Sequence, residues 1–212
     1  MTDPGPVAYS TITAAGARSQ RRIFIIGGPG SGKTWLAQRI GSGLGLEVHH
    51  LDEVARVGGG NGPERSPAER LASLDDILRE PGWVAEGVHI EWTDRLVHAA
   101  DLIIWLDHVS PGQAARRIVV RFVRTALAEV RRRPGLSKVT RIGDYIRNLH
   151  HLIAAVPESR RYYLSETRVA VAGNRADTAI RLGVYRHKLV HCRTIADVDD
   201  VVKQLFGASG TG

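Results

Sequence analysis

Short apolar runs alternate along this chain with segments whose apolar residues recur at helical spacing. The runs predict five strands, at residues 22–26, 46–51, 83–85, 101–106 and 188–192. They are uniformly apolar instead of alternating with polar positions, which is typical of parallel strands covered on both faces. Because helices are expected between them, the pattern predicts an α/β fold of three layers, with a doubly wound, parallel, five-stranded sheet.

Two of the expected helices begin at clear caps. Residues 66–69 (SPAE) combine a capping box with proline at the first helical position, and they predict a helix to about Arg79. Residues 110–113 (SPGQ) repeat this pattern and predict a long helix to about Arg133, ended by proline and glycine. Its apolar stripe is predicted at Ala115, Val119, Phe122, Ala126 and Val130. Other helices are expected at residues 34–44, 93–99, 142–156, 158–171 and 194–206.

These elements predict a single domain over residues 21–206, with a helical, basic insertion at about 134–187 before the last strand. Small and polar residues predict disordered tails at 1–20 and 207–212. We expect neither a signal peptide nor a membrane span, since no apolar run approaches the roughly 20 residues that a spanning helix needs. One cysteine, Cys192, allows no internal disulfide, and we expect a cytoplasmic protein.

The formal net charge of +7 is unevenly distributed. Residues 116–168 hold 13 Lys and Arg against four Asp and Glu, a net +9, so the remainder carries −2. This imbalance indicates an anionic partner for the basic region, with phosphates as the first candidate. Whether the region is a catalytic lid or a nucleic-acid- or protein-binding surface stays open. Residues suited to weak contact with a nucleic-acid backbone are Arg131, Arg132, Arg133, Lys138 and Arg141.

A glycine-rich loop joins the first expected strand to the first expected helix, and its spacing is that of a phosphate-binding loop (P-loop). Its glycines let backbone amides turn toward a phosphate chain. Lys33 would reach the β and γ phosphates, and the Thr34 hydroxyl would ligate magnesium. The predicted nucleotide-binding residues are Gly27, Gly28, Pro29, Gly30, Ser31, Gly32, Lys33 and Thr34.

Acidic residues follow three further strands: Asp52, Glu86 and Asp107. Because ligands of open parallel sheets lie beyond the carboxyl ends of the strands, these acids are expected at one edge. One can hold magnesium, and another can orient a substrate or accept the proton of a hydroxyl nucleophile. Each alone is also explained as a helix cap or loop acid. Together with the P-loop they favour function for Asp52 and Glu86 more than for Asp107.

Three segments, GGPGSGKTWLAQRIGSGLGLEVHHLD, PGWVAEGV and ADLIIWLDHVSPGQAARRIVVR, resemble the adenylate-kinase-like nucleoside and small-molecule kinases. Within that superfamily the chain is most similar to the topology-modulation proteins. The resemblance covers about residues 22–124, with a weaker match over 188–206. It implies the strand order 2-3-1-4-5.

The resemblance also implies roles for particular residues. Arg117 and Arg121 match an Arg-x-x-x-Arg pair that contacts the adenine side and the phosphates in these kinases. Glu86 stands where they usually carry aspartate beside magnesium, and Asp52 matches an acid often used at the acceptor. The arginine with which adenylate kinases hold the monophosphate is missing, since the chain reads EGVHI over residues 86–90.

The sequence thus predicts an ATP-dependent, magnesium-requiring phosphotransferase whose acceptor it does not name. The predicted catalytic residues are Lys33, Asp52, Arg117 and Arg121, and Thr34 and Glu86 are the predicted metal ligands. The alternative is a nucleotide-responsive binding module with slow ATP hydrolysis, in which the basic helices contact nucleic acid or a protein.

Overall fold

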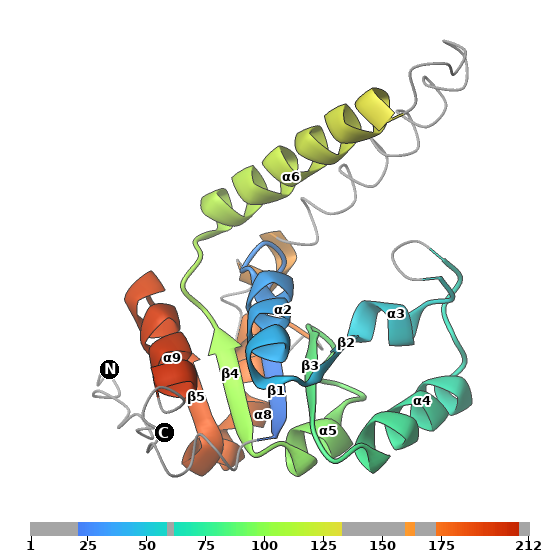
Figure 1. Cartoon of the computed structure of the whole chain (residues 1–212), viewed down its shortest axis with the longest axis vertical. Coiled ribbons are helices and arrows are strands. Elements are labelled where there is room, and N and C mark those ends of the chain that lie inside the picture. Colours follow the sequence, from blue (N-terminus) through green and yellow to red (C-terminus); the bar gives the residue numbers. More distant parts are fainter. Residues whose placement is uncertain (1–20, 59–61, 133–159, 164–172, 208–212) are drawn as a thin grey trace.

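The computed structural model contains one five-stranded sheet, and it describes residues 21–58, 62–132, 160–163 and 173–207. The strands are β1 (Arg22–Gly27), β2 (Glu47–His50), β3 (Trp83–Gly87), β4 (Leu102–Leu106) and β5 (Leu189–Cys192). Their order is β2-β3-β1-β4-β5, and every neighbouring pair is parallel (Figure 1). The predicted α/β class and strand order are therefore confirmed.

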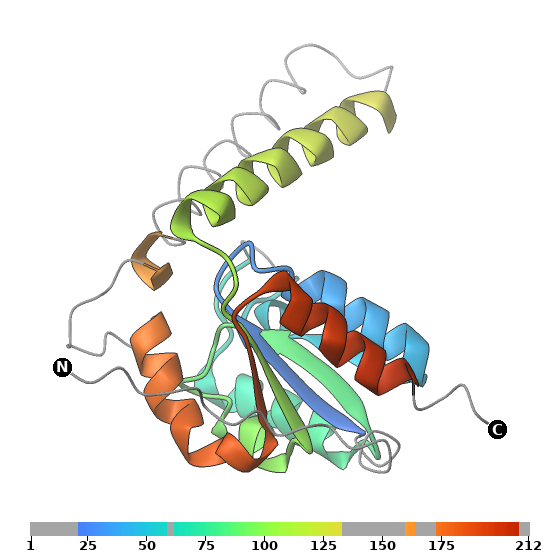
Figure 2. The ribbon, with the colours of Figure 1, turned by 90° about the vertical axis from the view of Figure 1, so that its left-hand side faces the viewer.

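Helices cover both faces of this sheet. They are α2 (Lys33–Leu44), α3 (Leu51–Ala55), α4 (Pro67–Arg79), α5 (Asp94–Ala99), α6 (Pro111–Arg132), α8 (Arg175–Leu182), the 3₁₀ segment η1 (Gly183–Lys188) and α9 (Ile195–Gly207). Figure 2 shows α2 and α9 side by side on one face, with α8 across the sheet. Helix α6 extends away from the layers beyond the carboxyl ends of the strands (Figure 1).

Alternate residues of β1 supply the two halves of the core. Ile23 and Ile25 are buried in the cluster that includes α2 and α9, whereas Phe24 and Ile26 are buried in the cluster that includes α4 and α5. A strand with apolar residues on both sides has to be covered on both sides. The central strand therefore requires the three layers, and the P-loop follows directly from its carboxyl end.

The predicted caps set the observed helix boundaries. Helix α4 runs from Pro67 to Arg79, and the Ser66 side chain accepts a hydrogen bond from the backbone N–H of Glu69. At the start of α6, the backbone N–H of Gln113 donates to Ser110 Oγ across 3.3 Å. These bonds satisfy N–H groups that the first helical turn leaves without partners.

Two details of the predicted pattern are wrong. The buried face of α6 is formed by Ala114 and Ile118, one residue before the predicted stripe, and Val119 is 39% exposed. The reason is tertiary: a Cβ at Gly30 would lie 3.0 Å from the carbonyl oxygen of Ala114, so α6 begins against the P-loop and the loop selects its face. Helix α8 and η1 lie within the insertion that was predicted to be helical, but no separate helix was predicted at their positions.

Several predictions lie outside the described residues. These are the N-terminal tail, residues 208–212 of the C-terminal tail, the helix at 142–156 and most of the insertion at 134–187. Gly207, which was predicted in the tail, is the last residue of α9. Of the helix predicted at 158–171, the structure describes residues 160–163, which are helical.

Candidate active site

The P-loop turns through two glycines that have positive φ. Gly30 has φ 77° and Gly32 has φ 96°, a region that side-chain-bearing residues rarely adopt. The backbone N–H of Ser31 donates to the carbonyl of Gly28 across 3.2 Å and closes the turn. A Cβ built on Gly32 would meet nothing within 4 Å, so the backbone here borders open space. The predicted loop therefore has a conformation in which its amides can face an anion.

Two aromatic side chains from within the insertion, Tyr162 and Tyr163, close the back of this loop. A Cβ at Gly28 would lie 2.4 Å from the Tyr162 ring and 2.6 Å from the Tyr163 ring. The Tyr163 hydroxyl donates to the carbonyl of Pro29 across 3.2 Å, and the Trp105 ring N–H donates to the Tyr162 hydroxyl across 3.3 Å. Burial raises the pKa of Tyr162 to about 12, so this hydroxyl stays protonated at neutral pH. The loop is thus supported by residues more than 130 positions away.

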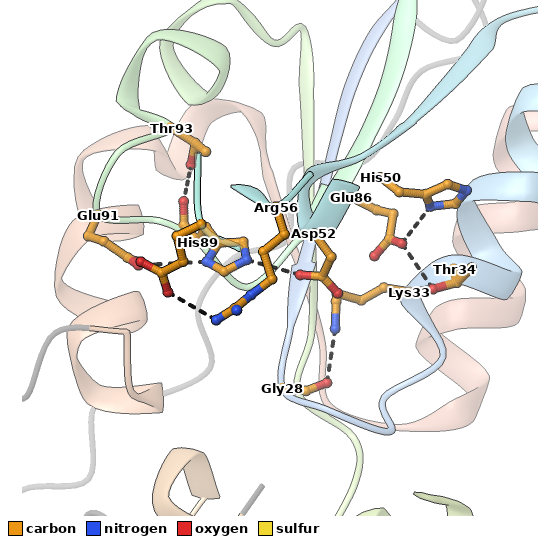
Figure 3. Close-up of polar contacts among 11 residues, drawn as sticks. Gly28, Lys33, Thr34, His50, Asp52, Arg56, Glu86, His89, Glu91 and Thr93 are labelled. Atoms are coloured by element: carbon orange, nitrogen blue, oxygen red, sulfur yellow. Dashed lines mark hydrogen bonds and ion pairs between the residues drawn. The ribbon is translucent and has the colours of Figure 1, made fainter. Parts of the chain in front are cut away.

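Lys33 begins α2, and its Nζ donates to the carbonyl of Gly28 across 3.1 Å, from one end of the loop to the other (Figure 3). Burial lowers the pKa of Lys33, and the negative charges of Glu86 and Asp52 oppose that change. The loop therefore has a lysine that can bind phosphate and carboxylates nearby. A site for a triphosphate and a metal ion needs both.

Glu86 is the penultimate residue of β3, inside the strand that it was predicted to follow, and its carboxylate contacts both Thr34 and His50. The Thr34 hydroxyl donates to Glu86 Oε1 across 2.9 Å, and His50 Nδ1 lies 2.8 Å from the same oxygen. The neighbouring His49 points the opposite way, to Glu80, because adjacent strand residues face opposite sides. A hydroxyl and a carboxylate are hard oxygen donors of the kind that magnesium prefers. Thr34 and Glu86 therefore fit the predicted metal position.

Asp52 was predicted to follow the second strand directly. The strand β2 instead ends at His50 and α3 begins at Leu51, so Asp52 lies in the first turn of α3. Its Oδ1 is 2.9 Å from His89 Nε2. Hydrogen bonding to His89 lowers the pKa of Asp52, with smaller contributions from the charges of His89 and Lys33, although burial opposes the shift. The Asp52 carboxylate is thus ionised at neutral pH. In Figure 3 it lies between Lys33 and His89.

Arg117 and Arg121 lie on α6 and line a cleft of about 630 Å³ that opens beside the P-loop. The Arg117 guanidinium donates to the carbonyl of Gly30 across 3.3 Å. Among the other side chains that line the cleft are Thr34, Trp35, Gln38, His108, Ile195 and Asp199. The structure therefore brings both predicted arginines to the cleft beside the phosphate loop.

Asp107 has a different role from the other acids. Its two carboxylate oxygens accept from Arg175, at 2.7 and 2.9 Å, and Oδ2 also lies 2.9 Å from His191 Nε2. The His191 ring stacks on Trp105 with centroids 3.9 Å apart. Asp107 thus connects β4, β5 and α8, and its oxygens are engaged by these partners.

Sequence patterns missed four residues of this site: His50, His89, Tyr162 and Tyr163. A metal site at the His49-His50 pair beside Asp52 is not expected from the sequence, because adjacent residues of a strand face opposite sides. The role of His50 and of His89 becomes visible only when β3 lies beside β2 and the loop after β3 turns back toward α3. The tyrosine pair stood in a segment where only a helix was predicted, and nothing in the sequence indicated its partner.

Among the described residues, no helix has both the length and the apolar character needed to cross a membrane. No known family model matches the chain, and no curated protein matches it. Among solved structures, the chain is similar to a gluconokinase from Sinorhizobium meliloti 1021, with 14% identity and a TM-score of 0.42. That similarity covers 90% of this chain and 92% of the gluconokinase chain.

Proposed function

We propose that this chain is an ATP-dependent, magnesium-requiring phosphotransferase that acts on a small-molecule or nucleotide acceptor. The observation that carries the proposal is the convergence on one P-loop of three features. Lys33 spans the loop, the Thr34 hydroxyl meets the Glu86 carboxylate, and Arg117 contacts the loop from α6. These are the parts that phosphoryl transfer uses for binding and for charge neutralisation.

Each residue then has a defined task. The loop amides and Lys33 bind the β and γ phosphates, and Arg117 and Arg121 neutralise charge on the transferring group. Thr34 and Glu86 would hold magnesium, which supplies positive charge at the phosphates when bound. Asp52 orients the acceptor hydroxyl. The acceptor oxygen bonds to the γ phosphorus as the bond to the ADP oxygen breaks, and the hydroxyl proton passes to Asp52 or to water.

The test is ADP release from ATP and magnesium, measured in a coupled assay across nucleosides, nucleoside monophosphates, sugars and 5′-hydroxyl oligonucleotides. We expect one class of acceptor to stimulate release in the wild type and not in Lys33→Ala. Lys203→Ala is the matched control, because Lys203 is an exposed lysine that pairs with Asp200 on α9. Stimulation that survives Lys33→Ala would contradict the proposal.

The binding-module alternative makes a different prediction in the same experiment. It expects tight ATP binding, no stimulation by any acceptor, and salt-sensitive association with nucleic acid or protein. The basic side chains on which it depends, Arg131, Arg132, Arg133, Lys138 and Arg141, lie outside the residues whose side chains the structure describes. We therefore favour the phosphotransferase, which rests on described contacts, and we retain the cytoplasm as its proposed location.

A further inference from the structure

His89 lies between two carboxylates, in the loop that follows β3. Its Nε2 lies 2.9 Å from Asp52 Oδ1, and its Nδ1 lies 3.7 Å from Glu91 Oε1. Figure 3 shows the imidazole between these two acids, which come from α3 and from the loop after β3. The histidine side chain is 24% exposed and that of Asp52 is 71% exposed. The histidine is therefore the fixed member of the group, and the aspartate faces solvent.

The loop that carries His89 is itself anchored. The Thr93 hydroxyl donates to the carbonyl of His89 across 2.5 Å, and Thr93 and Ile90 are buried. The Trp92 ring lies 5.4 Å from the His89 ring, centroid to centroid, and the Arg70 guanidinium lies over Trp92 at 5.6 Å. The Trp92 ring thus borders the imidazole that joins the two carboxylates. Small-molecule sites commonly combine apolar or aromatic surface with a few oriented polar groups.

The charges around His89 are paired among themselves. Burial opposes the charged imidazolium, but the hydrogen bond to Asp52 and the nearby charge of Glu91 outweigh it and raise the pKa of His89 to about 9. Three cations act on these two acids from neighbouring elements: Lys33 and Arg56 act on Asp52, and Arg181 acts on Glu91. Those cations have partners of their own, which are the Gly28 carbonyl, Glu64 and Asp177.

The carboxylates of Asp52 and Glu91 would repel the negative charge of a phosphomonoester, and the neighbouring cations already have partners. An uncharged hydroxyl group would instead find carboxylate oxygens to which it can donate a hydrogen bond. Asp52 Oδ1 is taken by His89, so Oδ2 is the oxygen that can accept from a substrate hydroxyl. The lowered pKa of Asp52 keeps this carboxylate ionised at neutral pH, and an ionised carboxylate is a good hydrogen-bond acceptor.

We propose that His89 is a positioning residue that holds Asp52 and Glu91 as hydrogen-bond acceptors for an uncharged, hydroxyl-bearing acceptor, in preference to a phosphomonoester. This inference rests on the proposed phosphotransferase activity and specifies the acceptor side of the same site. His89 acts through Asp52: it fixes one carboxylate oxygen so that the other faces the γ phosphate position near Lys33.

The test compares uncharged and phosphorylated forms of the same molecules. The probes are adenosine with AMP, and D-glucose with glucose 6-phosphate, each titrated in the presence of ATP and magnesium with ADP release as the readout. Binding of each probe to the full chain with ADP and magnesium is followed by the imidazole NMR signal of His89. We expect an uncharged probe to shift that signal and to be turned over, and its phosphomonoester to do neither.

Substitutions at His89 separate positioning from general folding effects. In His89→Ala, we expect the KM for the uncharged probe to rise about tenfold or more, with the KM for ATP unchanged. His89→Gln should recover most of this loss, because the glutamine amide nitrogen can take the place of Nε2, whereas His89→Asn should recover less. His98→Gln is the matched control, since His98 is an exposed histidine on the neighbouring helix α5.

Several outcomes would overturn the inference. Preferred turnover of AMP or glucose 6-phosphate, needing Lys33 but not His89, would refute it and leave the phosphotransferase intact. Equal losses for ATP and for the uncharged probe in His89→Ala would show a merely structural role. A wild-type chain that binds ATP and neither binds nor turns over any probe would refute both the inference and the proposed function.

Discussion

The hydroxyl of Thr34 donates to the carboxylate of Glu86 across 2.9 Å and joins the first turn of α2 to the end of β3. This bond spans 52 residues of sequence and crosses from the P-loop to the adjacent strand. Glu86 is buried, at 7% exposure, so its carboxylate needs the partners that Thr34 and His50 provide. The two predicted metal ligands are therefore already held together by the fold.

Replacing Glu86 with Gln tests this pair. The amide keeps the shape of the side chain but removes the charge that would attract magnesium. We expect the magnesium concentration for half-maximal ADP release to rise about tenfold or more. Binding of manganese, followed directly by electron paramagnetic resonance, should weaken in parallel. Glu80→Gln, which alters the carboxylate paired with His49, is the control. An unchanged metal requirement would remove Glu86 from the metal site.

Replacing Gly28 with Ala should distort the P-loop from behind. The new Cβ would lie 2.4 Å from the Tyr162 ring, so the ring or the loop must move. We expect unfolding free energy to fall by about 1–3 kcal/mol and ATP affinity to fall with it. Urea denaturation and equilibrium ATP binding measure the two effects. Gly112→Ala should leave both nearly unchanged, because a Cβ there meets nothing within 4 Å.

Stability should depend on pH through His89. Its pKa is raised from 6.5 to about 9 in the folded chain, against the effect of burial, by the hydrogen bond to Asp52 and the nearby charge of Glu91. The stabilising contribution is therefore complete below pH 6.5 and is lost as the pH rises through 9. We expect the stability difference between wild type and His89→Gln to shrink by on the order of 2 kcal/mol between pH 6 and 10, allowing for screening of the exposed Asp52. A constant difference in urea unfolding across this range would contradict the assignment.

Asp107 should matter at acid pH and for stability. Burial opposes its ionisation, but bonds from His191 and Arg175 hold the pKa of this carboxyl below its usual 3.8. Its contribution is therefore present above about pH 4 and is lost as the pH falls through the lower folded value. Asp107→Asn should lower the unfolding free energy at pH 7 by about 1–2 kcal/mol, since Arg175 is half exposed and can be hydrated.

The same variant gives the pH signature. Wild-type stability should fall more steeply than that of Asp107→Asn between pH 5 and 3, in urea unfolding at each pH. Asp200→Asn is the control, because Asp200 is largely exposed in its pair with Lys203. Parallel pH curves for the wild type and Asp107→Asn would show that Asp107 is not the group that titrates.

Local sequence signals predicted the elements that depend on neighbours in sequence. The cap at Ser66 gave the bounds of α4, and the apolar run at residues 102–106 gave β4. The P-loop was predictable because its glycines, Lys33 and Thr34 lie within eight residues. The buried face of α6 was predicted one residue late, because the contact of Ala114 with Gly30 sets it, and that contact spans 84 positions.

The site residues show the same division between positions that the sequence pattern predicts and positions that depend on contacts between distant residues. Asp52 and Glu86 were predicted from strand ends, since parallel strands bring their carboxyl ends to one edge. Neither His50 nor His89 was predicted as a site residue, because their partners Glu86 and Asp52 are distant in the sequence and are brought to them only when the chain folds. Asp107 also follows a strand, where function was favoured less than for Asp52 and Glu86, and the positions of Arg175 and His191 show that it is a structural acid.

The tyrosine pair behind the P-loop has a consequence for synthesis of the chain. Tyr163 bonds to Pro29 across 134 positions, and β5 and α9 are made later still. At the ribosome's pace of about 5–20 residues per second, the loop is translated on the order of ten seconds before its backing. A nascent chain therefore carries the phosphate loop for some time without the tyrosines that lie behind it. Nucleotide capture should begin only after the segment with Tyr162 and Tyr163 has been made.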